Sequence, residues 1–331
     1  MNDLQTIAGV LKKSRKVIIS GHITPDGDCV GSVLALGLAL GQLEKDITIA
    51  LPEPVPEIYS FLPGVRDFLL GERALGGDYD TFVVLDCSVP GRLGVLRVLL
   101  ERRLVVCSLD HHVSADQFAG YNYIDPEAAA TAEIVQDLCP LLKVAITPAI
   151  ATCLYTGIAT DTGSFQYENT KPDTHRRAAI LMEYGAPSGM INVQLHEQKP
   201  LAQLKVLAAV LPNLRLSTCG RVAWMSVTRE LLGNLNIEDE HVNGLINYAR
   251  SVRGVEVALL FREITPGRYK ISFRSKEAVD VNSLAARFGG GGHVRAAGCV
   301  LEGELPFIQE QVVRATLGAV KGQVNQPAGR P

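Results

Sequence analysis

The chain has 331 residues, of which 47% are hydrophobic and 20% are charged, and its formal net charge is -3. This length accommodates two domains with substantial cores, whereas the charge argues against a protein that binds long nucleic acid through a general basic surface. No apolar stretch is long enough to span a membrane, and the first residues lack the pattern of a signal peptide. Seven cysteines without C-x-x-C spacing indicate reduced, mostly buried thiols, so we expect a cytoplasmic protein.

The first informative segment joins a predicted buried strand at 17–20 to a predicted apolar helix at 29–40. His22, Asp26 and Asp28 lie in the Pro/Gly-rich turn between them. One imidazole and two carboxylates without a nearby cation form an unfavourable cluster, and metal ions are the natural counter-charge. These residues alone leave an alternative open, in which Asp28 is a helix N-cap and His22 is an ordinary turn residue.

Three later segments place an acid or an imidazole after an apolar, strand-like run. The runs cover residues 81–85, 104–109 and 154–160, and the last of them could also be helical. They lead into Asp86, into Asp110, His111 and His112, and into Asp161, respectively. Ligands bind beyond the carboxyl ends of the strands in open α/β sheets. We therefore expect these side chains to converge with those of the first loop.

The alternation of strand-like and helix-like runs predicts an α/β protein with two domains. The first domain, residues 1–185, is expected to hold a mostly parallel sheet flanked by helices, with further elements at 47–51, 128–138 and 148–158. Residues 186–215 are interpreted as a helical connector. Residues 216–320 are expected to form a smaller α/β domain with strands at 221–228, 255–263 and 269–274 and a helix at 283–288. The tail, 321–331, is rich in Gly, Pro and Gln and is predicted to be disordered.

A run of four glycines, 289–292, precedes His293 in the second domain. Glycines allow backbone conformations that other residues avoid, and successive N–H groups can then point inward as an anion-binding nest. Arg274, at the end of a predicted strand just upstream, suits bidentate phosphate recognition. We therefore favour a structured, phosphate-contacting loop; the alternatives are a flexible linker and, for Arg274, a surface salt bridge.

Taken in order, these motifs resemble those of the DHH phosphoesterase superfamily. The matching motifs in the first domain are H-x-x-x-D-x-D at 22–28, Asp86, Asp110-His111-His112 and Asp161-Thr162-Gly163. In the second domain, Gly-Gly-Gly-Gly-His at 289–293 and Ala-Ala-Gly at 296–298 resemble the C-terminal DHH-associated domain. Segments 123–126 and 128–133 resemble the nanoRNase/pAp phosphatase branch. The chain departs from many relatives at 114–116, where they carry Asn, and at Gln166, where they carry Arg.

The resemblance implies a role for each motif residue. His22, Asp26 and Asp86 would hold one metal ion, and Asp28, Asp86, His111 and Asp161 would hold a second. Mixed imidazole and carboxylate ligands suit manganese, with magnesium or cobalt as substitutes. Asp110 would orient a neighbouring histidine, and His112 would face the substrate phosphate. Arg274, Gly290, Gly291, Gly292 and His293 would bind the far end of the substrate, with the active site in the cleft between the domains.

The implied reaction is hydrolysis of a phosphoester by a metal-bridging hydroxide. The leading expectation is release of mononucleotides from short oligoribonucleotides, together with dephosphorylation of 3′-phosphoadenosine 5′-phosphate (pAp). A cyclic di-AMP or pApA phosphodiesterase is a close alternative, and a catalytically silent nucleotide sensor is an alternative of another class. An exonuclease on long strands and an inorganic pyrophosphatase fit less well. The resemblance also implies a homodimer. We assign no functional role to His175, His196 or His241.

Overall fold

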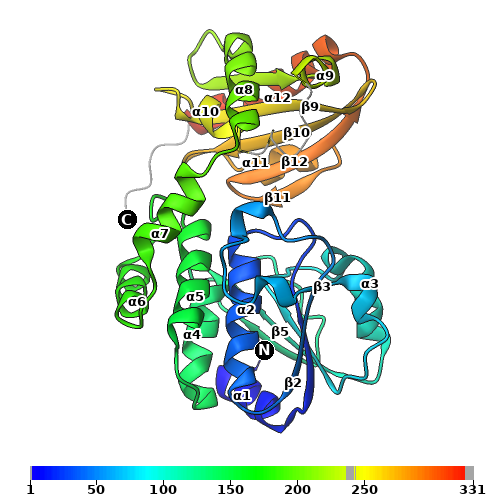
Figure 1. Ribbon diagram of the computed structural model, residues 1–331. Helices are drawn as coiled ribbons and strands as arrows, with labels where there is room; N and C mark the ends of the chain where they lie inside the picture. Colours follow the sequence, from blue (N-terminus) through cyan, green and yellow to red (C-terminus); the bar gives the residue numbers. More distant parts are fainter. Residues whose placement is uncertain (1, 236–241, 243, 325–331) are drawn as a thin grey trace. The chain divides into compact units, whose positions relative to one another are not determined.

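The computed structural model describes residues 2–235, 242 and 244–324, and the chain divides into two compact units (Figure 1). Unit 1 spans Met1–Gln198 and unit 2 spans Lys199–Pro331. The boundary falls inside the segment 186–215. Among the described residues, no helix combines the length and the apolar character that crossing a membrane requires.

Unit 1 contains a six-stranded sheet in the order β3-β2-β1-β4-β5-β6, and every neighbouring pair in it is parallel. The strands are β1 (Lys16–Ser20), β2 (Asp46–Leu51), β3 (Leu69–Leu70), β4 (Thr81–Leu85), β5 (Val105–Asp110) and β6 (Tyr121–Ile124). The predicted parallel sheet is therefore confirmed. Ser20 pairs with Val84, and Leu85 pairs with Leu109, so β1, β4 and β5 end at the same edge.

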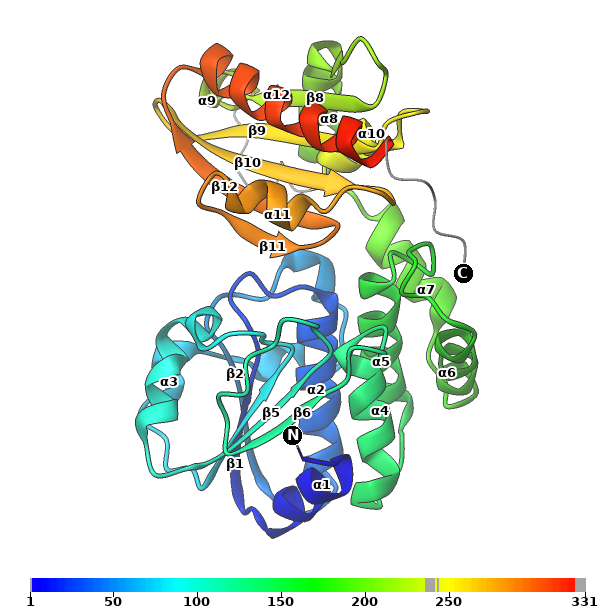
Figure 2. The same ribbon diagram turned by 180° about the vertical axis from the view of Figure 1, so that it is seen from behind.

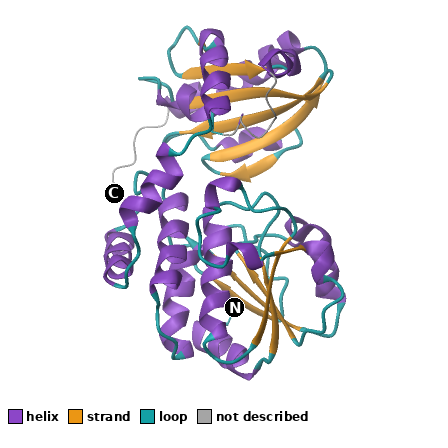
Figure 3. Ribbon diagram, viewed as in Figure 1, coloured by secondary structure: helices purple, strands orange, loops and turns teal. Residues whose placement is uncertain are grey.

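Helices cover both faces of this sheet, as Figure 3 shows. They are α1 (Leu4–Lys13), α2 (Gly27–Gly41), α3 (Gly71–Ala74), α4 (Thr131–Leu142), α5 (Pro148–Asp161), α6 (Pro172–Glu183) and α7 (Ser188–Asn192), with the shorter or tighter turns η1 (Glu57–Tyr59), η2 (Val65–Asp67), η3 (Pro90–Glu101) and η4 (Val193–Glu197). Residues that alternate along one strand point to opposite faces. Ile19 accordingly packs in the core with α1, α2, α4 and α5, whereas its neighbour Ile18 packs with α3 and η3.

The run 154–160 is helical, which confirms the helical alternative for this run and rules out the strand. It lies inside α5, which begins at Pro148 after the N-cap Thr147 and ends at Asp161. Three threonines in this helix are compatible with it because each hydroxyl donates a hydrogen bond to a backbone carbonyl four residues earlier. These bonds run from Thr152, Thr156 and Thr160. Asp161 therefore reaches the site from a helix end rather than from a strand end.

Small residues let α2 and α5 pack at close range. A Cβ atom at Gly31 of α2 would lie 2.4 Å from the carbonyl oxygen of Cys153 in α5. A Cβ atom at Gly157 of α5 would lie 2.9 Å from Oδ1 of Asp28 in α2. Since real Cβ atoms do not approach other atoms this closely, glycine is required at both positions for the observed approach. The same contact brings the carboxylate of Asp28 toward the end of α5.

Unit 2 is a smaller α/β domain, as expected, built on a mixed sheet in the order β11-β12-β10-β9-β8-β7 (Figure 2). Its strands are β7 (Arg215–Leu216), β8 (Val222–Val227), β9 (Val257–Thr265), β10 (Arg268–Ser275), β11 (Gly291–His293) and β12 (Ala296–Glu302), and only β8 and β9 are parallel neighbours. The helices are α8 (Leu201–Val210), η5 (Leu211–Asn213), α9 (Arg229–Leu235), α10 (Ile246–Ser251), α11 (Val281–Ala286) and α12 (Leu305–Val324).

The two faces of this second sheet carry different helices. Ala223 and Met225 of β8 pack in a core with α8, α9 and α10, whereas Val222 and Trp224 pack with α11 and α12. The predicted disordered tail begins inside α12, which extends through Val324, and the rest of that segment, 325–331, lies outside the described residues.

Candidate metal centre

The loop after β1 and the start of α2 carry the first three predicted site residues. His22 is 2% exposed and Asp28 is fully buried, whereas the carboxylate of Asp26 is exposed. Asp26 is the N-cap of α2, and its Oδ1 accepts a hydrogen bond from the backbone N–H of Cys29 at 3.1 Å. The alternative that made Asp28 the N-cap is therefore wrong, because Asp28 already belongs to the first turn of the helix.

Asp86, directly after β4, lies at the centre of the predicted site. It is 2% exposed and its backbone has a φ of 55°, in the left-handed region that non-glycine residues rarely adopt. Such a conformation costs on the order of 1–3 kcal/mol and persists where the surrounding structure enforces it. Its two carboxylate oxygens face different partners. Oδ2 lies 3.4 Å from Nε2 of His22, and Oδ1 lies 3.6 Å from Nε2 of His111.

The remaining predicted ligands lie around these contacts. Nε2 of His22 is 3.7 Å from Oδ2 of Asp26. Nε2 of His111 is 3.4 Å from Oδ2 of Asp161 and 4.0 Å from Oδ2 of Asp28. The structure thus brings all six predicted ligands together, in two groups that share Asp86.

The spacing of these atoms fits a shared cation better than direct hydrogen bonding. Nitrogen–oxygen hydrogen bonds are about 2.7–3.2 Å long, and the contacts between imidazoles and carboxylates here are 3.4–4.0 Å long. Two ligand atoms that each lie about 2.1 Å from one ion are separated by roughly 3.0–3.5 Å. Residues of this kind also match the donor preference of manganese and related divalent ions. The residues present therefore fit a two-metal site.

The electrostatics of the centre show how unevenly its carboxylates share the available positive charge. Burial, followed by the negative charge of Asp86, raises the pKa of Asp28 to about 7. Burial also opposes ionisation of Asp86, but the nearby imidazoles of His22, His112 and His111 outweigh it and hold its pKa below the usual range. The carboxyl of Asp161 has its pKa raised by burial and by the charges of Asp28 and Asp26. A bound cation would relieve this repulsion.

The carboxylate of Asp28 is also tied to the start of α4. Its Oδ2 accepts a hydrogen bond from the backbone N–H of Thr131 at 2.6 Å, and its Oδ1 accepts one from Ala132 at 2.9 Å. The first N–H groups of a helix lack partners within the helix and favour negative charge. Asp28 therefore joins the N-terminus of α4 to α2 as well as facing His111.

Asp110 and His112 form a buried pair beside the two groups. Oδ1 of Asp110 accepts a hydrogen bond from the backbone N–H of His112 at 3.0 Å and lies 2.6 Å from Nδ1 of its ring. Burial disfavours the charged ring of His112, but the hydrogen bond to Asp110 and the charge of Asp86 outweigh it and raise its pKa. Among the described residues, Oδ2 of Asp110 is buried and has no hydrogen-bond partner.

Three contacts at the centre were not predicted from the sequence. Nη2 of Arg92 lies 3.0 Å from Nδ1 of His22, although Nδ1 also lies 2.7 Å from the carbonyl oxygen of Ile23. The hydroxyl of Thr131 donates a hydrogen bond to Oδ1 of Asp86 at 3.1 Å. Cys29 groups with His22 and Asp86, but burial raises the pKa of its thiol well above the usual value, and a neutral thiol is a poor ligand. The only feature of the sequence that could have indicated a role for Arg92 at this centre is its position six residues after Asp86.

The predicted substrate-binding residues lie in unit 2. Gly291–His293 form the edge strand β11, and the N–H of Gly292 donates to Oδ1 of Asn282 at 2.8 Å. A Cβ atom at Gly290 would lie 2.1 Å from the carbonyl oxygen of Gly298, and the φ of Gly292 is 150°, so both positions require glycine. The run is therefore a structured segment and not a flexible linker. Arg274 lies in β10, and its cross-strand partner in β12 is Ala296. Strand β10 lies between β12 and β9 in the sheet.

Two of the three histidines without an assigned role lie in the described part of the chain. The ring of His175 stacks on that of Phe165 with their centroids 5.2 Å apart, and Nε2 of His196 lies 2.7 Å from the hydroxyl of Ser164. His241 lies outside the described residues.

Comparison with known proteins identifies both units. The family model for the N-terminal domain of the DHH family matches residues 16–158, and the model for the DHHA1 domain matches residues 221–324. A protein from Thermus thermophilus named bifunctional oligoribonuclease and PAP phosphatase NrnA is 35% identical over 94% of this chain and 93% of its own length. A Bacillus subtilis protein of the same name is 26% identical over 85% of this chain and 88% of its own length.

Solved structures share this fold. The crystal structure of an exopolyphosphatase-related protein from Bacteroides fragilis superimposes with a TM-score of 0.87 at 26% identity, over 96% of this chain and 95% of that one. RecJ from Thermus thermophilus, solved in complex with Mn²⁺, gives a TM-score of 0.56 at 13% identity and covers 96% of this chain but 55% of that one. The second likeness concerns the fold alone.

Proposed function

The chain belongs to the DHH phosphoesterase family, and from this premise we propose that it hydrolyses short oligoribonucleotides to mononucleotides and removes the 3′-phosphate of pAp. The relatives named oligoribonuclease and PAP phosphatase, which match it over nearly its whole length, support this choice of substrates. The observation that carries the proposal is the position of Asp86, whose two oxygens face two separate groups of metal-binding side chains.

In this proposal, His22, Asp26 and Asp86 hold one divalent ion, and Asp28, Asp86, His111 and Asp161 hold a second. Manganese is the favoured metal because mixed imidazole and carboxylate donors suit it, with magnesium or cobalt as substitutes. Two such ions would supply Lewis acidity and an activated water for attack on phosphorus. Four ionised carboxylates balance the charge of two divalent cations, which accounts for the accumulation of acids at one buried edge.

His112 has two features that suit a catalytic role next to these ions. Asp110 fixes its ring through Nδ1, which directs the Nε2 edge of the ring away from that carboxylate. The hydrogen bond to Asp110 and the charge of Asp86 outweigh burial and raise the pKa of His112, which favours the protonated form of its ring. A protonated imidazole can stabilise negative charge that develops on the phosphoryl group and can deliver a proton to the leaving oxygen.

The glycine-rich segment of unit 2 and Arg274 are proposed to hold the end of the substrate that is not cleaved. Glycines have no side chain that blocks the approach of a ligand to the backbone, and a guanidinium suits bidentate contact with phosphate. Gly290, Gly291, Gly292 and His293 would contribute to this contact. Replacing Arg274 with Ala should raise the Michaelis constant more than it lowers the turnover number, because binding of the remote phosphate is weakened in the ground state and in the transition state alike.

An assay of several substrates can distinguish two alternative functions from the leading one. A cyclic di-AMP or pApA phosphodiesterase would use the same metal centre on a different substrate. A nucleotide sensor would bind without turnover, and the complete set of six metal-binding side chains argues against it. A manganese-dependent assay with pAp, pApA, cyclic di-AMP and a five-residue RNA compares these functions directly.

We expect the five-residue RNA and pAp to be the best substrates of this panel. Preference for cyclic di-AMP or pApA would replace the proposed substrate class, and binding without hydrolysis of any of the four would identify a sensor. Asp86→Ala should abolish both hydrolysis and manganese binding while leaving the far-ultraviolet circular dichroism unchanged. Undiminished activity of this variant would overturn the assignment of the metal centre.

The proposal also places the protein in the cytoplasm as a homodimer, as the family resemblance implies. All seven cysteines are free, six of them are buried, and a reducing compartment suits such thiols. Light scattering after size-exclusion chromatography measures the mass of the particle, and a single-chain mass at micromolar concentration would exclude the dimer.

A further inference from the structure

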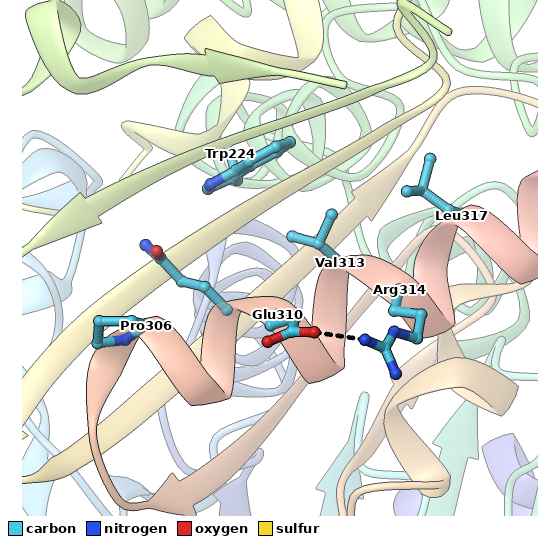
Figure 4. Close-up of a pocket in the computed structure, with 7 residues that line it drawn as sticks. Trp224, Pro306, Glu310, Val313, Arg314 and Leu317 are labelled. Atoms are coloured by element: carbon cyan, nitrogen blue, oxygen red, sulfur yellow. Dashed lines mark hydrogen bonds and ion pairs between the residues drawn. The ribbon is translucent and has the colours of Figure 1, made fainter. Parts of the chain in front are cut away.

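A groove on unit 2, remote from the glycine-rich segment, combines an aromatic ring with charged side chains. It lies between β8 and α12, has a volume of about 420 Å³, and is lined by Trp224, Pro306, Gln309, Glu310, Val313, Arg314 and Leu317 (Figure 4). This volume falls in the range of about 300–1,000 Å³ that is usual for small-molecule sites. Trp224 is the single tryptophan of the chain.

The position of Trp224 leaves part of its ring available to a ligand. The ring is half-buried, and Val313 points toward it from α12 (Figure 4). Arg215 of β7 is the cross-strand partner of Trp224, so both side chains project from the same face of the sheet. Arg215 is exposed, although it is not one of the residues that line the groove.

Arg314 provides the cation that lines the groove. It pairs with Glu310 one helical turn earlier, and the two side chains are 78% and 63% exposed. Ion pairs this exposed contribute little to stability, so a phosphate can compete with Glu310 for the guanidinium. The lining holds one cation, Arg314, and one carboxylate, Glu310, so the anion would be recognised by the guanidinium of Arg314 once Glu310 is displaced.

From these observations we propose that the groove is a second nucleotide-binding site, in which a nucleobase stacks on Trp224 and the adjoining phosphate binds Arg314. Aromatic rings that accept bases beside cations that accept phosphates are the usual means of binding single-stranded nucleic acid without sequence preference. The polar side chain of Gln309, which donates to the hydroxyl of Ser226 at 2.6 Å, lies at the same groove and suits the edge of a base.

A neighbouring pocket suggests a strand of RNA as the source of the nucleotide. Arg314 also lines a shallow depression on the far side of α12, together with Arg287 and Phe288. Phe288 directly precedes Gly289, the first residue of the glycine-rich run. A second aromatic residue and a further arginine therefore lie between the groove and the segment proposed to bind substrate. The inference that the ligand is an RNA strand rests on the proposed function, whereas the inference that the groove binds a nucleotide does not.

The fluorescence of the single tryptophan reports directly on this site. Three strands separate β8 from β11, which places Trp224 about 19 Å from the glycine-rich edge at about 4.8 Å per strand spacing. Stacking at the glycine-rich segment would therefore leave the emission of Trp224 unaffected. We expect AMP, which has no phosphodiester to cleave, to quench the emission of the full-length protein, and inorganic phosphate to leave it unchanged.

Variants in the groove make the test specific. Arg314→Ala should weaken AMP binding roughly tenfold while leaving adenosine binding unchanged, because only AMP offers a phosphate. Glu310→Gln should tighten AMP binding roughly threefold, since it removes the competing carboxylate, and a disrupted fold would not produce this gain. Absence of quenching by AMP, or equal weakening of AMP and adenosine by Arg314→Ala, would overturn the proposal.

Two further measurements show whether the bound nucleotide is free or part of an RNA strand, and whether a second copy of the chain covers the groove. In the Asp86→Ala background, which prevents cleavage, tighter quenching by a five-residue RNA than by AMP would identify a strand, and equal quenching would identify a free nucleotide. Emission that shifts with protein concentration and ignores AMP would instead show that a second copy of the chain covers the groove, contrary to the proposal. Quenching that persists when RNA hydrolysis fails would separate this site from the proposed activity.

Discussion

Asp28→Asn should weaken the dependence of stability on pH in the metal-free protein. In the folded chain the carboxyl of Asp28 is fully buried and has a pKa of about 7, against an ordinary value of 3.8. The native state therefore holds a proton that the unfolded state releases between about pH 4 and pH 7, and stability falls as pH rises through that window. The difference between these two pKa values corresponds to roughly 4 kcal/mol at neutral pH.

Other groups in the centre act in the same direction. The pKa values of Asp26 and Asp161 are also raised. The pKa values of three histidines, His22, His111 and His112, are raised as well, so the stability that these histidines contribute is lost above about pH 6.5. Asp86 has a lowered pKa, and its contribution is lost only below about pH 4. The wild-type protein without metal should therefore become steadily less stable from pH 4.5 to 7.5.

Asp28→Asn removes the cost of a buried charge and introduces the cost of unpaired N–H groups. Its amide places N–H groups opposite the backbone N–H of Thr131 or Ala132, which costs about 1–3 kcal/mol at every pH. At pH 4.5 Asp28→Asn should be less stable than wild type, and at pH 7.5 it should be as stable or more stable. Manganese should restore the wild type at pH 7.5 and leave the variant nearly unchanged.

Urea unfolding followed by far-ultraviolet circular dichroism, with EDTA or with manganese, measures these differences. Asp67→Asn, at an exposed carboxylate in η2, is the control and should follow wild type throughout. If the metal-free wild type and Asp28→Asn lost the same free energy of unfolding between pH 4.5 and 7.5, the argument from the buried carboxylate would be refuted.

Three further perturbations test the geometry of the centre. Arg92→Ala removes a cation that lies 3.0 Å from Nδ1 of His22 and should tighten manganese binding roughly tenfold in calorimetry, since like charges repel; unchanged or weaker binding would contradict this reading. Gly157→Ala places a methyl group 2.7 Å from Cβ of Ala132 and should destabilise the protein by about 1–3 kcal/mol in thermal melts, whereas Gly9→Ala, in an open helical position, should be neutral or stabilising. Asp110→Asn should shift the acid-to-neutral transition of His112 to lower pH in nuclear magnetic resonance titration, because the hydrogen bond and charge of Asp110 help to raise that pKa; an unmoved transition would count against the pair.

The sequence alone was sufficient for the parallel sheet and for the identity of most residues at the centre. β1, β4 and β5 are short apolar runs, and the polar residues that follow them are forced to one edge by the direction of a parallel sheet. The convergence of His22, Asp86 and His111 could therefore be predicted without coordinates. The close packing at Gly290 and the positive φ of Gly292 likewise follow from a run that only glycine can occupy.

Local pattern was insufficient where a helix and a strand share the same composition. The run before Asp161 is apolar and rich in β-branched residues, which suits a strand, yet hydroxyl-to-carbonyl hydrogen bonds let it continue α5. A carboxylate at the C-terminal end of a helix is electrostatically disfavoured. This placement only becomes understandable when α2 and α5 are seen to bring Asp161 toward His111.

The contacts that complete the centre were decided by tertiary structure. Asp28 binds the N–H of Thr131 across 103 positions of the chain, and Arg92 reaches His22 across 70. Such pairs have no local signature, because they depend on how elements pack after they have formed. The sequence determined which chemical groups the protein carries and which edge of the sheet receives them. Packing of α2 against α4 and α5 determined which oxygen faces which imidazole, since separations of a few ångströms depend on side chains from every layer at once.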